Sequence, residues 1–209
     1  MLLSSIKDKL LAPQHRTKLI LASKSPRRVD ILRKAGFAFE VRATDIDESP
    51  RGRESARTHV LRLAREKARA VAEQLGENGR AVVIGADTVV VIGGKILGKP
   101  SDVREARAML RLLNGKTHQV LTGVSIVSMH DKRELNRVES TRVHFLKLSK
   151  KEIEDYIHTG EPFDKAGGYG IQGIAGRFID RIDGCYFNVM GLPISLVWTM
   201  LRQLGVASR

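Results

Sequence analysis

One carboxylate interrupts an otherwise apolar stretch of this chain. Asp87 lies within VVIGADTVVVIG, which predicts two short strands or one interrupted strand. A lone ionised carboxylate buried there costs several kcal/mol unless it is paired or binds a metal. Asp87 is therefore either part of a turn at a strand end, or a metal ligand or general base at such an end, where the sites of α/β proteins gather.

A lysine occupies an equally unusual place on a predicted helix. Residues 54–75 have the spacing of a long helix, and Lys67 falls inside its apolar stripe. That stripe comprises Val60, Ala64, Ala68, Val71 and Leu75. Two interpretations stay open: Lys67 extends from the edge of the stripe to solvent, or it directs a cation into a cleft.

An acidic loop precedes this helix. Glu48 lies in ATDIDES together with Asp45 and Asp47, and the loop could be merely polar. However, Mg²⁺ in proteins is usually held by one or two carboxylates together with the phosphates of a substrate. Glu48 is thus a possible metal ligand.

Two arginines stand at the wrong end of another predicted helix. KLILAS predicts a strand over 18–22, and Ser25 followed by Pro26 predicts a helix start, with the helix covering 26–35. Arg27 and Arg28 fall in its first turn, where the helix dipole is already positive. This placement is unfavourable unless an anion binds there.

Two glycine-rich stretches resemble nucleotide-binding motifs, but each lacks residues or elements that its motif requires. GGKILGKP, residues 93–100, has Pro100 where a P-loop needs the hydroxyl that holds Mg²⁺. Gly168-x-Gly170-x-x-Gly173 lacks the preceding strand, the following helix and the acidic residue of a dinucleotide fingerprint. We reject both motifs.

The elements that must position these residues alternate along the chain. The pattern predicts an α/β fold with a mixed sheet, because two adjacent long strands imply antiparallel pairing. Besides those above, the predicted strands are 38–43, 118–129, 136–147 and FIDRID. The other predicted helices run from Ser101 or Asp102 to Leu113, from the capping box Ser149-x-x-Glu152 to His158, and through GLPISLVWTMLRQLG.

Composition limits the classes of partner. The chain has 209 residues, one cysteine and a net charge of +13, which favours nucleic acid, anionic lipid or phosphorylated small molecules as partners. No apolar run approaches the roughly 18 residues of a membrane span, and the N-terminal stretch is a poor signal peptide. We expect a cytoplasmic protein with no membrane partner.

Six stretches, in order, resemble the Maf family of nucleoside triphosphate pyrophosphatases. They are LASKSPRR, ESARTHVLRLAREKA, VIGADTVVVIGGKILGKP, GKTHQVLTGVSI, TGEPFDKAGGYGIQG and NVMGLPI. The resemblance implies a mixed, twisted sheet flanked by helices, two lobes with a nucleotide-binding cleft in the Maf/ITPase-like manner, and a homodimer. It starts near Lys18 and so divides the chain into an N-terminal extension, 1–17, and one domain, 18–209.

The resemblance also implies a reaction and a site. The reaction is metal-dependent hydrolysis of a nucleoside triphosphate to the monophosphate and pyrophosphate, with Mg²⁺ favoured over Mn²⁺ or Co²⁺. Matching residue by residue gives Asp87 as the catalytic residue and Glu48 with Asp87 as metal ligands. The phosphate-binding residues are then Ser23, Arg27, Arg28, Lys67 and Lys99, and the base-specificity residues are Arg27, Thr88 and Gln172.

A triphosphate would explain the two arginines. The helix N-terminus, the hydroxyl of Ser23 or Ser25 and both guanidiniums could then bind the same anion. We therefore expect replacement of Arg28 to weaken triphosphate binding while costing the fold little.

Gln172 points to a branch of the family. In the resemblance, glutamine at this position accompanies dTTP and UTP, with modified pyrimidine triphosphates as further substrates, whereas glutamate accompanies 7-methyl-GTP. A carboxamide offers a donor and an acceptor together and so matches the alternating edge of uracil or thymine. The alternatives are a 7-methyl-GTP or other modified-nucleotide pyrophosphatase of the same family.

Two other classes could also account for the charge. A nucleic-acid-binding module would be basic, but aromatic residues are only 5% of this chain and are not interleaved with the basic ones, as stacking platforms require. We expect no specific nucleic-acid partner. A regulatory interaction protein is the other alternative.

Overall fold

The computed structural model describes residues 17–76 and 80–206, so nearly all of the expected extension, residues 1–17, lies outside it. The strands are β1 Lys18–Ala22, β2 Glu40–Val41, β3 Ala81–Ile92, β4 Lys95–Leu97, β5 Thr117–Ser128, β6 Arg133–Phe145 and β7 Ile179–Asp183. The helices are α2 Pro26–Lys34, α3 Ala56–Leu75, α4 Val103–Leu113, α5 Lys150–His158, α6 Tyr186–Val189 and α7 Ile194–Gln203. Three short 3₁₀ helices are η1 Glu161–Asp164, η2 Ala166–Gly168 and η3 Ile174–Phe178.

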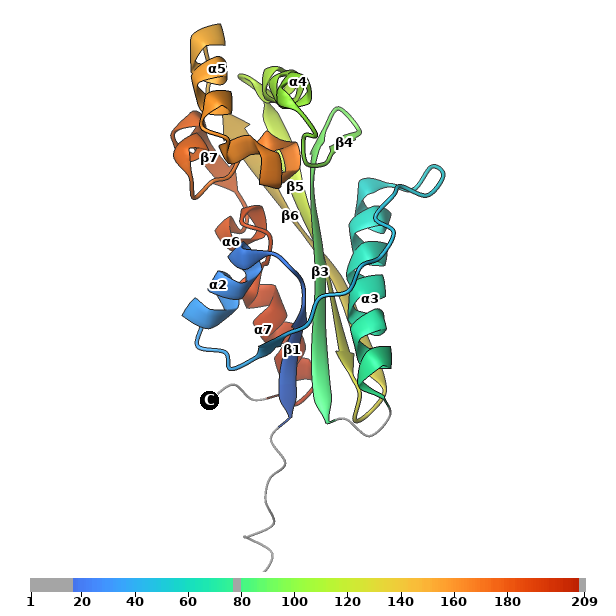
Figure 1. Cartoon of the computed structure of the whole chain (residues 1–209). Helices are drawn as coiled ribbons and strands as arrows, with labels where there is room; N and C mark the ends of the chain where they lie inside the picture. Colours follow the sequence, from blue (N-terminus) through green and yellow to red (C-terminus); the bar gives the residue numbers. More distant parts are fainter. Residues whose placement is uncertain (1–16, 77–79, 207–209) are drawn as a thin grey trace, which may run out of the picture.

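These strands form one mixed sheet. Its order is β2-β1-β3-β5-β6-β7, and β4 pairs with β3 beside this path (Figure 1). β1 runs parallel to both β2 and β3, whereas the long strands β3, β5 and β6 pair antiparallel. The predicted mixed α/β fold is confirmed.

The stretch around Asp87 is one continuous strand. β3 pairs with β5 without a break from Val82 to Val91, so the prediction of two short strands or an interrupted strand is wrong. The uninterrupted ladder to β5 satisfies the backbone through Asp87, and no turn is needed. Asp87 therefore lies inside a strand, and the interpretation as a strand-end turn residue is also wrong.

The other edge of β3 has a gap at this point. β1 pairs with β3 only as far as Gly85, and β4 begins to pair at Val90. Residues 86–89 thus have no strand partner on that side within the described sheet. Successive side chains of a strand point to opposite faces. Asp87 and Thr88 therefore lie on opposite faces of the sheet, beside the same unpaired edge.

Two apolar cores lie on either side of this gap. One core joins β1, α2 and α7 to the N-terminal half of β3; the other joins α4 and α5 to the far ends of β3, β5 and β6. Figure 1 shows these two lobes at opposite ends of the long strands. The expected two-lobed architecture is confirmed, and the gap in β3 lies where the lobes meet.

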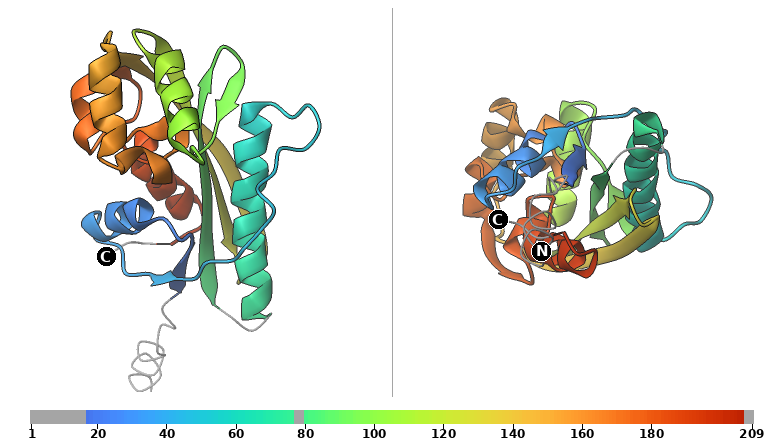
Figure 2. Two further views of the ribbon diagram at one scale, coloured as in Figure 1. Left: turned by 45° about the horizontal axis from the view of Figure 1, so that its top comes forward. Right: turned by 90° about the horizontal axis from the view of Figure 1, so that it is seen from below.

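Helix α3 covers the opposite face of the sheet from α2 and α7, as the view from below shows (Figure 2). It lies close to the strands because Gly85 and Gly123 carry no side chain. A Cβ on Gly85 would overlap the Ala64 carbonyl, and one on Gly123 would overlap the Val60 carbonyl. These two close approaches place the α3 residue Lys67 beside β3.

Local signals set the helix ends. α2 begins at Pro26 with Ser25 as its N-cap residue, although the Ser25 hydroxyl makes no capping bond. The capping box predicted for α5 is present, with Ser149 and Glu152 exchanging both bonds.

The stretch that we rejected as a P-loop forms a turn from β3 into β4 through Gly93 and Gly94, both at positive φ. No described helix is long and apolar enough to cross a membrane.

Candidate active site

A cavity of about 870 Å³ opens where the two lobes meet. It is bordered by the end of β1, the start of α2, the free edge of β3, and the segment from Asp164 to Gly173. Every site residue predicted from the sequence lines it: Ser23, Arg27, Arg28, Glu48, Lys67, Asp87, Thr88, Lys99 and Gln172. The fold therefore brings together residues that are scattered over most of the chain.

An ion-pair cluster occupies the α3 side of the cavity. The Lys67 ammonium donates to Asp87 Oδ1 at 2.7 Å and lies 2.6 Å from Glu48 Oε1. The side chains of Lys67 and Asp87 are each 11% exposed, whereas that of Glu48 is 60% exposed. Lys67 thus points into the cavity, and the interpretation as a lysine that extends to solvent is wrong.

The charge of Lys67 acts on Glu48. Partial burial raises the pKa of the Glu48 carboxyl. The hydrogen bond and charge of Lys67, together with the charges of Lys99 and Arg28, outweigh burial, and the net shift is downward. Glu48 is therefore ionised at neutral pH and keeps oxygen lone pairs facing the cavity.

The two carboxylates fit a hard divalent cation. Asp87 and Glu48 converge on one positive group from a strand and a loop, and carboxylate oxygens are the ligands that Mg²⁺ prefers. Among residues 17–76 and 80–206, no group of three or more His, Cys, Asp or Glu side chains is arranged to hold a metal. The donor set thus suits a cation shared with phosphate oxygens rather than an all-protein site.

The loop that carries Glu48 is fixed by a salt bridge that sequence reasoning missed. Arg62 on α3 donates to the Ser49 carbonyl at 3.0 Å and to the Glu54 carboxylate at 2.6 and 3.0 Å. The Arg62 hydrogen bonds hold the pKa of Glu54 well below its ordinary range, despite burial that raises it. The Arg62 side chain is only 14% exposed, so this salt bridge is largely buried.

Arg28 lies deeper than its place in a first helical turn suggests. Its Nε donates to the Gly191 carbonyl at 2.8 Å, and its Nη1 donates to Ser23 Oγ at 3.1 Å and to the Ala86 carbonyl at 2.9 Å. Its Nη2 donates to Thr88 Oγ1 at 3.1 Å. Burial lowers the pKa of this guanidinium, and the charge of Asp87 partly offsets that effect.

The Arg28 geometry argues against one expectation from the sequence. An arginine has five N–H donors, and four of those of Arg28 are used within the protein. Arg28 links Ser23 after β1, the strand β3 and the segment before α7, so we now predict that removing it destabilises the fold, contrary to the expectation from the sequence. One N–H remains for an anion.

Ser23 keeps a donor for a ligand. Its Oγ accepts from Arg28 and from the Ser25 backbone N–H at 3.2 Å. Both bonds use oxygen lone pairs, so its own O–H proton is left to donate. The Ser23 side chain is buried, and its bond from the Ser25 N–H places the oxygen at the start of α2.

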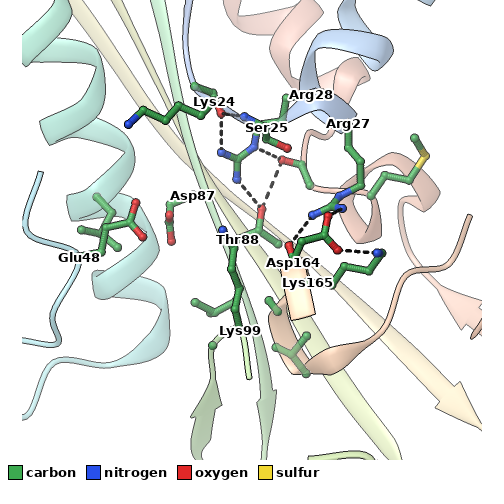
Figure 3. Close-up of a pocket in the computed structure, with 18 of the residues that line it drawn as sticks. Lys24, Ser25, Arg27, Arg28, Glu48, Asp87, Thr88, Lys99, Asp164 and Lys165 are labelled. Atoms are coloured by element: carbon green, nitrogen blue, oxygen red, sulfur yellow. Dashed lines mark hydrogen bonds and ion pairs between the residues drawn. The ribbon is translucent and has the colours of Figure 1, made fainter. Parts of the chain in front are cut away.

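Arg27 reaches across the cavity to the other lobe. It donates from Nη1 to Asp164 Oδ2 at 2.8 Å and from Nη2 to the Asp164 carbonyl at 3.0 Å (Figure 3). Burial raises the pKa of Asp164, but hydrogen bonds from Lys165 and Arg27 lower it by more. Sequence reasoning missed Asp164, although the EPFDK stretch offered a carboxylate beside a lysine.

The remaining predicted residues differ in how their polar groups are used. Thr88 Oγ1 lies 2.9 Å from Thr122 Oγ1 and accepts from Arg28. Lys99 and Gln172 are exposed, line the cavity, and make no hydrogen bond or ion pair with any described residue. Their side chains are thus free to bind a ligand.

The fold and the cavity together define an α/β protein with a cationic cleft beside two carboxylates, suited to a polyanion and a divalent cation. The chain belongs to the Maf-like protein family, because the model of that family matches residues 18–204.

Curated relatives cover most of the chain. The dTTP/UTP pyrophosphatase of Hahella chejuensis is 47% identical over 191 residues, which is 91% of this chain and 94% of that protein. Those of Koribacter versatilis and Bacillus pumilus, which carry the same name, are 48% and 49% identical, covering 90% of this chain and 95% and 97% of theirs. The solved Ham1 protein of Staphylococcus aureus has a TM-score of 0.43 and 14% identity, covering 61% of this chain and 71% of that one.

Proposed function

We propose that this protein is a nucleoside triphosphate pyrophosphatase that hydrolyses dTTP and UTP to the monophosphate and pyrophosphate. One observation carries the proposal: the carboxylates of Glu48 and Asp87 and the cations predicted to bind phosphate line the same cavity. The names of the relatives from Hahella, Koribacter and Bacillus support the substrate.

In the proposed mechanism, Asp87 orients a water and takes its proton. The water oxygen forms a bond to the α-phosphorus while the bond from that phosphorus to the bridging oxygen breaks, so pyrophosphate leaves intact. Lys67 and Lys99 stabilise the charge that develops on the transferred and leaving groups. Arg27 and the free N–H of Arg28 contribute in the same way, and Ser23 donates to a phosphate oxygen.

A divalent cation would be held by Glu48 and Asp87 together with phosphate oxygens. We propose Mg²⁺, with Mn²⁺ or Co²⁺ as substitutes; bound there, it would neutralise phosphate charge and lower the pKa of water.

We propose that the base is recognised by Gln172, Arg27 and Thr88. The free Gln172 carboxamide can pair with the C=O and N–H edge of uracil or thymine, and modified pyrimidines keep that edge. 7-Methyl-GTP is the runner-up substrate, which a carboxylate at this position would favour.

We propose further that residues 18–209 form one domain after the extension 1–17. We also propose that the protein is cytoplasmic, that it forms a homodimer, and that it has no specific nucleic-acid partner. Tyr186 and Phe187 support self-association, since each is 41% exposed and they pack together.

The test is a panel of nucleoside triphosphates with Mg²⁺, followed by separate measurement of pyrophosphate and orthophosphate. We expect pyrophosphate from dTTP and UTP. Orthophosphate alone would indicate ordinary NTPase chemistry, and no release from any triphosphate would favour a nucleic-acid-binding or regulatory protein.

A further inference from the structure

We propose that Glu161 is a positioning residue for substrate choice, because it holds the segment that carries Gln172. The inference rests on the proposed function, in which Gln172 contacts the base. Glu161 belongs to η1, in the lobe that contains α4 and α5, and is half-buried. It lies against Gly173, which lines the cavity.

The Glu161 carboxylate joins that segment to a rigid core residue. Oε2 accepts the Ile174 backbone N–H at 2.9 Å, two residues beyond Gln172. Oε1 accepts the Tyr156 hydroxyl at 3.2 Å, and Tyr156 is fully buried within α5. A phenol fixed by the core thus holds the carboxylate, and the carboxylate holds the segment.

Two glycines let the segment lie directly on this support. A Cβ on Gly173 would overlap the Glu161 carboxylate. A Cβ on Gly170 would come within 2.7 Å of the Lys165 side chain. The backbone on both sides of Gln172 therefore rests on side chains of the same short stretch, which fixes the point from which the Gln172 side chain extends.

The same stretch also holds Arg27. Lys165 Nζ donates to the Glu161 carbonyl at 2.7 Å and to Asp164 Oδ1 at 2.6 Å. Asp164 in turn accepts from Arg27 at 2.8 Å (Figure 3). Glu161 and its neighbours thus set the position of Gln172 relative to Arg27.

Position matters because hydrogen-bond discrimination depends on it. A site that hydrogen-bonds one base rejects another only if its polar groups cannot shift to suit both. A loosened segment would let the backbone at Gln172 shift, so that its carboxamide could also pair with a guanine edge. Loss of Glu161 should therefore change selectivity more than it changes the chemical step.

The variant for the test is Glu161→Met, which keeps the side-chain length and removes both acceptor oxygens. The ratio of kcat/KM for UTP to kcat/KM for GTP should fall about tenfold, with kcat for UTP changing less. Glu161→Gln should restore most of the ratio, because its carboxamide can accept from Ile174 and donate to the Tyr156 oxygen.

A matched control separates positioning from stability. Glu152→Ala removes a capping-box bond from α5 in the same lobe without contacting the cavity. It should lower the melting temperature and leave the UTP to GTP ratio unchanged. A ratio for Glu161→Met within about twofold of the wild type would overturn the inference. If that variant does not fold, Tyr156→Phe, which removes one support of the carboxylate, takes its place under the same criterion.

A second readout does not need activity. Deuterium exchange at the Ile174 amide should be faster in Glu161→Met than in the wild type and in Glu152→Ala. Unchanged exchange would overturn the inference. A wild-type protein that releases no pyrophosphate would contradict the proposed function instead, and the exchange result would still decide whether Glu161 positions the segment.

Discussion

The ammonium of Lys67 lies 2.7 Å from Asp87 Oδ1, and the same nitrogen lies 2.6 Å from the Glu48 carboxylate. The Lys67 ammonium thus lies between the two carboxylates, in the position that a divalent cation shared by them would occupy. The ion pairs hold the two carboxylates close together without a ligand.

Removing this lysine should affect metal binding and turnover in opposite directions. In Lys67→Met, nucleotide-free protein should bind Mn²⁺ about tenfold more tightly, because a competing positive charge is gone. The rate of pyrophosphate release should fall, since the phosphates lose a cation. Calorimetric titration with Mn²⁺ alone checks the first effect, and equal or weaker binding than in the wild type would contradict it.

The carboxylate of Asp87 should be needed for the chemical step. Asp87→Asn keeps the shape of the side chain but removes its basicity, so kcat should fall by about 10²–10⁴-fold. Steady-state pyrophosphate release measures this change, with the far-UV spectrum as a control for folding. Near-wild-type hydrolysis would refute the role of Asp87.

The two neighbouring arginines should differ in their effect on stability. Arg28→Ala removes the Arg28 donors to the buried carbonyls of Ala86 and Gly191, and Gly191 keeps only a 3.3 Å bond from Thr88. The variant should destabilise the ligand-free protein by about 2–4 kcal/mol. Arg27→Ala removes a partly exposed ion pair to Asp164 and should cost about 0–1 kcal/mol. Denaturant unfolding of both variants without nucleotide tests the contrast, and equal losses would contradict it.

Acid should weaken the support of the Glu48 loop. The folded-state pKa of Glu54 is lowered from its ordinary 4.5, so its stabilising effect is fully present above that pH and is lost as pH falls through the folded pKa. Unfolding free energies of the wild type and Glu54→Gln should converge between about pH 5 and about pH 2. Parallel pH profiles would show that the Glu54–Arg62 pair does not contribute.

The side chain at position 172 should bias the choice of base. Gln172→Glu offers only acceptors, so kcat/KM for UTP should fall about tenfold relative to that for 7-methyl-GTP. Both substrates are assayed for pyrophosphate release in the same buffer. A lower rate with both, at an unchanged ratio, would place the base away from Gln172.

Local features of the sequence determined where the helices begin and which residues stand out. The Ser149–Glu152 capping box and Pro26 act within one turn of helix, so their outcome depends on neighbours along the chain. The position of Lys67 inside an apolar stripe could be recognised for the same reason. Whether its side chain extends to solvent or points into a cleft could not. The six motifs indicated the family because their residues and their order can be read directly along the chain, without knowing the fold.

Tertiary structure alone decided what these residues contact. Arg28 meets Gly191, 163 residues away, and Arg27 meets Asp164, 137 residues away, and no local pattern encodes such pairs. The continuity of β3 through Asp87 likewise depends on pairing with β5, which supplies hydrogen bonds that the stretch itself lacks. The sequence therefore determined which groups are available, and packing between distant segments decided which are already bonded and which remain free for a ligand.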